Sequence, residues 1–74
     1  MSIKIKIGMR IKELRTANNI SQQELAYLCD IDRTYITQVE NGKRNISIVN
    51  IEKIARALKV SISFFFNDGK FDDN

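Results

Sequence analysis

The chain has 74 residues, of which 43% are hydrophobic and 28% charged, and it carries a formal net charge of +3. This length leaves room for one domain, and the composition is typical of a folded protein and not of a disordered chain. Because there is no histidine and only one cysteine, Cys29, an internal disulfide is excluded, and the usual zinc ligands and general bases are missing. We therefore expect no metal, no cofactor and no enzymatic activity, and we interpret Cys29 as a small buried helical residue.

The positive charge is concentrated in the first part of the chain. Residues 1–45 carry eight Lys and Arg against five Asp and Glu, whereas residues 46–74 carry four of each. Asp68, Asp72 and Asp73 make the end of the chain acidic, so we expect this end to face away from a polyanion. No apolar run approaches the roughly 18 residues of a membrane span, and residues 1–8 alternate isoleucine with lysine. We therefore expect a cytoplasmic protein without a membrane segment.

The first helix is predicted from the spacing of apolar residues. Ile7, Ile11 and Leu14 recur at intervals of four and three residues, which predicts a helix from about Ile5 to Ala17. The isoleucines also alternate as in a strand, but no second strand is predicted with which they could pair. We therefore expect residues 1–4 to form a loose lead-in.

A second helix is predicted to start at a capping box. Ser21 and Glu24 have the spacing at which each side chain bonds to the backbone amide of the other. The apolar face of this helix is expected to consist of Leu25, Ala26, Leu28 and Cys29. The helix is short because the sequence Asp30-Ile31-Asp32 interrupts the helical pattern.

A third helix is expected directly after this turn, from Arg33 to Asn41. Asp32 is a suitable N-cap, and Gly42 is placed as the left-handed residue that ends the helix. Ile36 and Val39 have the spacing of a face turned inward. Two short helices separated by about three residues result.

Two further helices complete the predicted fold. Ser47 caps a helix that runs through Lys59 and has the largest apolar stripe, consisting of Ile48, Ile51, Ile54, Ala55 and Leu58. Ser61 caps a final helix, Ile62 to Phe66. We expect an all-α fold of five helices in a single domain over residues 1–74, with a core of about 5–66 and a polar tail at 67–74.

The second and third helices together form a helix-turn-helix, the motif that places its second helix in the DNA major groove. With Ile36 and Val39 turned inward, the opposite face presents Arg33, Thr34, Thr37 and Gln38. Arginine pairs with the major-groove edge of guanine, glutamine with that of adenine, and threonine offers both a hydroxyl and a methyl group. We therefore predict that these four residues read base pairs.

The same residues belong to a series of motifs that resembles the Cro/lambda-repressor-like helix-turn-helix family, also called the XRE family. The resemblance covers roughly residues 7–66 and rests on I-x-x-L-R (Ile11 to Arg15), S-Q-x-x-L-A (Ser21 to Ala26), Ile31-Asp32, Y-I-x-x-V-E-N-G-K-R (Tyr35 to Arg44), I-x-x-I-A-x-A-L-x-V-S (Ile51 to Ser61) and Phe66. One departure is Asp30, which stands where the family often has glycine at the turn. Aspartate tolerates a left-handed backbone, so the turn is still expected.

The resemblance implies roles for further residues. It implies that the DNA backbone is held by Gln22, Tyr35, Asn41, Lys43, Arg44 and Asn45. It also implies an internal salt bridge between Arg15 and Glu40, which joins the first and third helices.

Within the family, the run Asp32 to Ile36 followed by Arg44-Asn45 is most similar to the controller proteins of restriction-modification systems, which act as small dimers on operator DNA. Phage repressors and antitoxin-type autoregulators share most of these residues and stay open as alternatives. A homodimer is expected because two-fold symmetry places a second recognition helix one helical turn of DNA away, about 34 Å. The expected dimer surface on the last helix is Ile62, Phe64 and Phe65. Because Ile62, Phe65 and Phe66 can face the core, Phe64 is the residue that marks an interface. Alternatively, all three phenylalanines close a small core.

The function predicted from the sequence is therefore a transcription regulator that binds a palindromic double-stranded DNA operator as a homodimer. The alternative is an interaction module whose main role is to dock a protein partner, as an antitoxin docks a toxin. RNA binding is disfavoured because no sheet is expected that would carry stacking aromatic residues. No small-molecule ligand is expected.

Overall fold

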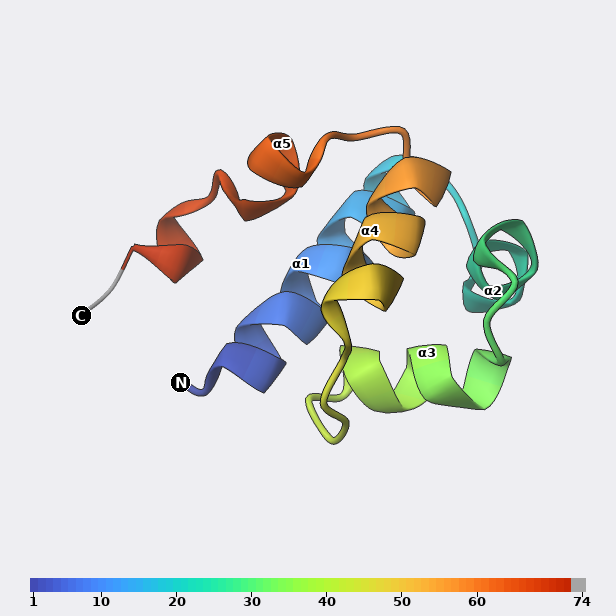
Figure 1. The fold of residues 1–74 in the computed structure, drawn as a ribbon, viewed down its shortest axis with the longest axis horizontal. Helices are drawn as coiled ribbons and strands as arrows, with labels where there is room; N and C mark the ends of the chain where they lie inside the picture. Colours follow the sequence, from blue (N-terminus) through green and yellow to red (C-terminus); the bar gives the residue numbers. More distant parts are fainter. Residues whose placement is uncertain (73–74) are drawn as a thin grey trace.

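A computed structural model describes residues 1–72, and every regular element in that range is helical. In chain order the elements are α1 (Ile3–Ala17), α2 (Gln22–Cys29), α3 (Arg33–Glu40), α4 (Ile48–Ala57), α5 (Ile62–Phe66) and a short 3₁₀ turn, η1 (Gly69–Phe71). Figure 1 shows α1 running through the centre, α2 and α3 at one end and α5 at the other. The predicted all-α fold of five helices is confirmed.

Each of the five helices begins at a polar residue whose side chain accepts a hydrogen bond from an amide of the first turn. These caps are Ser2, Ser21, Asp32, Ser47 and Ser61. The prediction for residues 1–4 was wrong, because Ser2 accepts from the amide of Ile5 at 3.4 Å and α1 starts at Ile3. A capped first turn is thus present where a loose lead-in was expected.

Left-handed backbone conformations follow four of the helices, at Asn19, Asp30, Gly42 and Lys59. Asp30 (φ 54°), in the turn after α2, and Gly42 (φ 72°), just after α3, adopt this conformation, which confirms both predictions. Lys59 also has a positive φ of 61°, so α4 ends at Ala57 and not at Lys59. Asn41 is the C-cap of α3 and lies just outside the helix.

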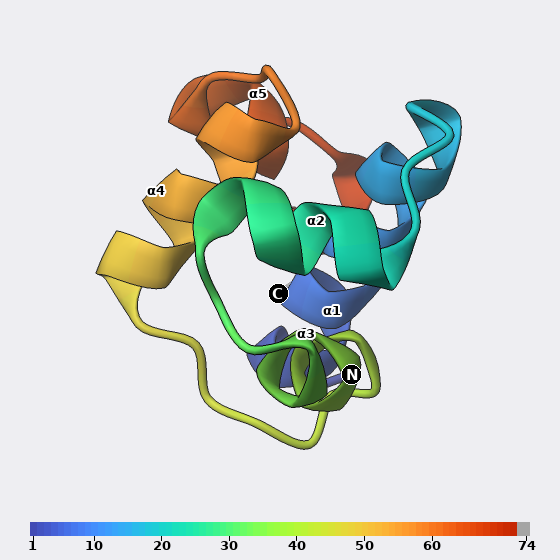
Figure 2. The same ribbon diagram turned by 90° about the vertical axis from the view of Figure 1, so that its right-hand side faces the viewer.

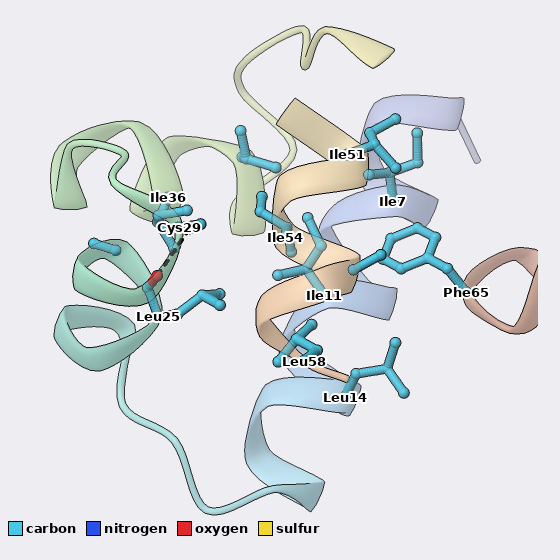
Figure 3. Packing of buried hydrophobic residues seen from close by; sticks show 13 residues of the cluster. Ile7, Ile11, Leu14, Leu25, Cys29, Ile36, Ile51, Ile54, Leu58 and Phe65 are labelled. Atoms are coloured by element: carbon cyan, nitrogen blue, oxygen red, sulfur yellow. Dashed lines mark hydrogen bonds between the residues drawn. The ribbon is translucent and has the colours of Figure 1, made fainter. Parts of the chain in front are cut away.

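One core joins all five helices. Figure 3 shows side chains of α1 and α4 interleaved, with Leu25 and Ile36 approaching from one side and Phe65 from the other. Cys29 is buried at the edge of this cluster and its thiol donates to the carbonyl of Leu25 at 2.8 Å. Burial raises the pKa of the Cys29 thiol, so it stays protonated and structural, as predicted.

Two residues assigned to inward stripes point outward instead. Leu28 of α2 is 55% exposed and Ile48 of α4 is 82% exposed. Both lie at the edge of an apolar stripe that is wider than the surface its helix buries, and periodicity alone does not tell which edge is covered.

Residues 67–72, the described part of the predicted polar tail, are docked on α1. Arg10 of α1 donates to the carbonyls of Phe64 and Phe65 at 2.8 and 2.7 Å and to the carboxylate of Asp68 at 3.4 Å. Lys70 bonds to Asp68 at 2.9 Å and to Glu13 of α1 at 2.8 Å.

This docked segment perturbs the titration of Asp68. The amide of Lys70 and then its ammonium group hold the pKa of Asp68 below its usual value. The contribution of Asp68 to folding is therefore present above the ordinary pKa of an aspartate and is lost as the pH falls through the lowered value. Asp73, predicted to belong to an acidic end, lies outside the described residues.

Gly8 lies where α1 meets the end of α3. A Cβ atom at this position would collide with the backbone carbonyl oxygens of Val39 and Glu40. Backbone atoms cannot swing aside as a flexible side chain does, so the close approach of the two helices requires glycine here.

We therefore predict that Gly8→Ala destabilises the protein, although alanine is the better helix former by about 1 kcal/mol. The forced separation of α1 and α3 is expected to outweigh that gain and to lower the free energy of unfolding by about 1–3 kcal/mol, measured by urea denaturation. Gly69→Ala is the control, because a Cβ there meets no atom within 4 Å. A Gly8→Ala variant as stable as the wild type would contradict the close approach.

Candidate nucleic-acid interface

The helix-turn-helix is formed by α2, a three-residue turn and α3. Figure 2 shows α2 crossing above α3, with α3 at the surface and the loop to α4 extending beyond it. Asp30 turns the chain in a left-handed conformation, and the amide of Ile31 bonds to the carbonyl of Ala26 at 3.0 Å. Asp32 then caps α3 by accepting from the amide of Thr34 at 2.7 Å.

A buried ion pair fixes α3 to the rest of the protein. The guanidinium of Arg15 in α1 donates twice to the carboxylate of Glu40, the last residue of α3, at 2.7 and 3.0 Å. The predicted salt bridge is thus confirmed. The hydrogen bond to Glu40 raises the pKa of Arg15, so its guanidinium stays charged.

Gln22, the first residue of α2, joins this pair to the exposed side of α3. Its amide nitrogen donates to Glu40 at 3.0 Å, and its amide oxygen accepts from the hydroxyl of Thr37 at 2.9 Å. A carboxylate only accepts, so Gln22 must turn its nitrogen toward Glu40. The structure therefore places both predicted DNA-contacting residues, Gln22 and Thr37, in an internal network at the edge of the exposed face.

The predicted base-reading residues lie on one side of α3. Arg33 and Thr34 are exposed, whereas Thr37 and Gln38 are half-buried. Arg33 donates to the side-chain oxygen of Gln23 in α2 at 3.4 Å, which leans it toward the start of α2. The hydroxyl of Thr37 is engaged by Gln22, so its methyl group is the part left for contact with a base.

A second cluster consists of Tyr35, Gln38 and Arg44, at the edge of the exposed side that lies farther from Arg33. Arg44 donates to the side-chain oxygen of Gln38 at 2.8 Å, and its guanidinium lies 4.9 Å from the centre of the Tyr35 ring. The hydroxyl of Tyr35 accepts from the amide nitrogen of Asn50 in α4 at 3.1 Å. Sequence reasoning missed Asn50, because no local pattern links two residues that are fifteen positions apart.

The residues predicted to hold the DNA backbone lie beside the exposed side of α3 that carries Arg33, Thr34, Thr37 and Gln38. Asn41, Lys43, Arg44 and Asn45 are all exposed in the loop that follows α3. The amide of Lys43 bonds to the carbonyl of Gln38 at 2.9 Å, which ties the start of this loop to the helix. Arg33, Lys43 and Arg44 thus place three cations around one exposed helix, an arrangement suited to a polyanion.

The predicted dimer surface needs one correction. Phe65 is 0% exposed and packs in the core, so it has no surface to offer a partner. Phe64 and Ile62 are 50% and 40% exposed and stay available. The guanidinium of Arg10 lies 5.4 Å from the centre of the Phe64 ring and covers one of its faces.

A larger apolar surface lies beside these residues and was not predicted. Ile48 and Val49 at the start of α4 are 82% and 60% exposed. With Ile51 and Glu52 of α4 and Ile62 and Phe66 of α5 they line a groove of about 330 Å³, which we call the α4–α5 groove. Two consecutive apolar residues directly after a cap were the available signal, because both cannot face the core of one helix.

The described residues form neither a metal centre nor a membrane span. Over residues 1–72 no three side chains of the metal-ligating types gather where an ion could be held. In the same range, no helix combines the length and apolarity that crossing a membrane requires.

Comparison with known proteins matches this geometry to one family. The family model described as "Helix-turn-helix" matches residues 11–65. The control protein C.MunI from a Mycoplasma species is 46% identical over 67 residues, which cover 89% of this chain and 90% of that protein.

Two solved structures agree in fold and in family. The restriction-modification controller protein C.AhdI from Aeromonas hydrophila has a TM-score of 0.82 at 48% identity, covering 85% of this chain and 96% of that one. The controller protein C.Esp1396I, solved as a tetramer in complex with its natural 35 base-pair operator, has a TM-score of 0.83 at 37% identity, covering 89% of this chain and 88% of that one. The chain therefore belongs to the helix-turn-helix family and, within it, to the control proteins of restriction-modification systems.

Proposed function

We propose that this chain is a dimeric transcription regulator that inserts α3 into the major groove of a palindromic DNA operator. The observation that carries the proposal is the exposed side of α3, which is rich in hydrogen-bond donors and is held in place from behind by the buried pair Arg15–Glu40. Such a face meets the requirements of base reading, in which side chains must be both reachable and fixed in direction. We propose that the protein has no catalytic role and that it binds DNA in the cytoplasm.

The residues of α3 divide into two roles. Arg33 is the strongest candidate for base reading, because it is exposed at the start of the helix and guanidinium donates two bonds to guanine. Thr34 lies beside it, and Thr37 offers its methyl group to thymine. Gln38 gives its oxygen to Arg44, which leaves its amide hydrogens for an acceptor on a base edge.

Backbone contacts come from the loop after α3 and from the start of α2. Lys43 and Arg44 supply positive charge, and Asn41 and Asn45 supply side-chain amides. Gln22 donates one amide hydrogen to Glu40 and has the second one left for a phosphate. Phosphate contacts of this kind position the protein and carry no sequence information. They are expected to dominate the salt dependence of binding.

The dimer is proposed to form through the α4–α5 groove, to which Ile62 belongs, together with the neighbouring Phe64. A domain of this size buries only about 60% of the surface of its unfolded chain, so a partner that covers exposed isoleucine and valine adds stability. The assembly of C.Esp1396I as a tetramer on its operator supports association between copies on DNA.

We predict that Arg33→Ala and Lys43→Ala weaken DNA binding in different ways. The probes are a duplex that the wild-type protein selects from a random pool and a random-sequence duplex of equal length. Arg33→Ala should weaken binding to the selected duplex by about 1–3 kcal/mol and relax the preference at one base pair in each half-site. Lys43→Ala should weaken both duplexes alike and flatten the salt dependence. Equal losses on both duplexes for Arg33→Ala would remove it from base reading.

We also predict that Ile48→Glu breaks the dimer. A carboxylate in an apolar interface is left without a partner, and the loss of a central apolar contact is expected to cost about 2 kcal/mol or more of association free energy. Sedimentation equilibrium of the wild type and the variant gives the two dissociation constants. Tyr27→Glu is the matched control, because Tyr27 is 85% exposed on α2, away from the groove. A dimer that survives Ile48→Glu unchanged rules out the groove as its interface.

A further inference from the structure

Asn50 connects α4 to the recognition helix by a single side-chain hydrogen bond. Its amide nitrogen donates to the hydroxyl oxygen of Tyr35 at 3.1 Å. Both side chains are half-buried, so water does not fully replace this bond when it is broken. The backbone amide of Asn50 bonds to the cap residue Ser47 at 3.1 Å, which holds Asn50 in the first turn of α4.

The direction of this bond decides what Tyr35 can do. The amide NH₂ of Asn50 is a donor only, so the Tyr35 oxygen accepts and its own proton must point elsewhere. Asn50 occupies one lone pair of the Tyr35 oxygen, so the hydroxyl hydrogen is free to be donated to another group. Tyr35 belongs to α3, and its hydroxyl therefore lies at the border of the exposed side of that helix. A phosphate oxygen is the kind of acceptor that a DNA duplex brings there.

The ring of Tyr35 transmits this placement to a base-reading residue. Arg44 lies over the ring, with 4.9 Å between the guanidinium carbon and the ring centre, and donates to the side-chain oxygen of Gln38 at 2.8 Å. Guanidinium has donors and no acceptor, so Gln38 must present its oxygen to Arg44. Asn50, Tyr35, Arg44 and Gln38 therefore form one chain of contacts from α4 to the middle of α3.

We propose that Asn50 is a positioning residue for operator recognition, which acts through Tyr35 and Arg44 and does not itself contact DNA. The inference rests on the proposed function, since it presumes that α3 reads an operator. The Asn50 side chain on α4 sets the direction of the Tyr35 hydroxyl and the position of the Tyr35 ring, over which the guanidinium of Arg44 lies. Removing the donor loosens both without removing any DNA-contacting group.

The test is a double-mutant cycle on binding to the duplex selected by the wild type and to the random-sequence duplex. Asn50→Ala and Tyr35→Phe break the same hydrogen bond from its two ends, and Tyr35→Phe also removes the hydroxyl that is expected to donate to a phosphate. Each is expected to weaken binding to the selected duplex about threefold to tenfold and to reduce the ratio of selected to random affinity. The double variant should lose no more affinity than the more impaired of the two single variants, because either single change already removes the bond.

Asn50→Asp separates positioning from stability. It keeps the shape of the side chain, and a carboxylate in the first turn of α4 is favourable for the helix, so the unfolding midpoint should stay at or above that of the wild type. It has no donor for Tyr35 and instead accepts the hydroxyl proton. The Tyr35 hydroxyl is then turned toward α4 and is lost as a donor to DNA. The ratio of selected to random affinity, in which a general repulsion from DNA cancels, should therefore fall below that of the wild type.

Three outcomes decide the proposal. A retained ratio in Asn50→Asp together with a loss in Asn50→Ala would assign Asn50 a structural role only, and losses that multiply in the double variant would show that Asn50 and Tyr35 act separately. Either result overturns this inference and leaves the proposed function intact. A wild-type protein that selects no sequence from the random pool overturns the proposed function and this inference with it.

Discussion

The buried pair Arg15–Glu40 is the interaction on which the arrangement of the other helices depends. It joins the last turn of α1 to the last residue of α3, and Gln22 extends it to the first residue of α2. Burial of two charges costs desolvation energy that the direct attraction barely offsets, so such a pair is weak evidence for stability. Its geometric effect is strong, because two guanidinium bonds to one carboxylate allow a single rotation of α3 about its axis. That rotation turns Ile36 and Val39 inward and leaves Arg33 and Thr34 outside.

The fold thereby separates two surfaces that a regulator of this size needs. One surface consists of the exposed side of α3 and the loop after it, and it carries donors and positive charge. The other is the α4–α5 groove, which is lined by apolar side chains with Glu52 as the one charged residue among them. Asn50 lies in the first turn of α4, next to Val49 of the groove and bonded to Tyr35 of the recognition helix. The two surfaces therefore meet at the start of α4.

The sequence was sufficient for the features that are local. Each helix start except the first was predicted from a capping residue, the left-handed turns were predicted at Asp30 and Gly42, and Arg33 and Thr34 were placed outside by the spacing of two buried residues. The failures concern contacts between distant segments. Nothing near Ser2 indicated a helix so close to the chain start, and the bond between Asn50 and Tyr35 has no local signature. Spacing on the five-residue α5 allowed Phe65 to face the core, yet Phe65 was also assigned to the dimer surface, and its complete burial decides for the core.

The central claim is that the exposed side of α3 reads the major groove at two symmetric half-sites, and methylation interference on the selected duplex tests it most directly. Dimethyl sulfate methylates guanine N7 in the major groove and adenine N3 in the minor groove. The account predicts that methylated guanine N7 blocks binding at two positions related by two-fold symmetry, about one helical turn or 34 Å apart, and that Arg33→Ala loses this sensitivity. Interference from adenine N3 alone, or from guanine N7 at positions that Arg33→Ala leaves equally sensitive, would contradict it.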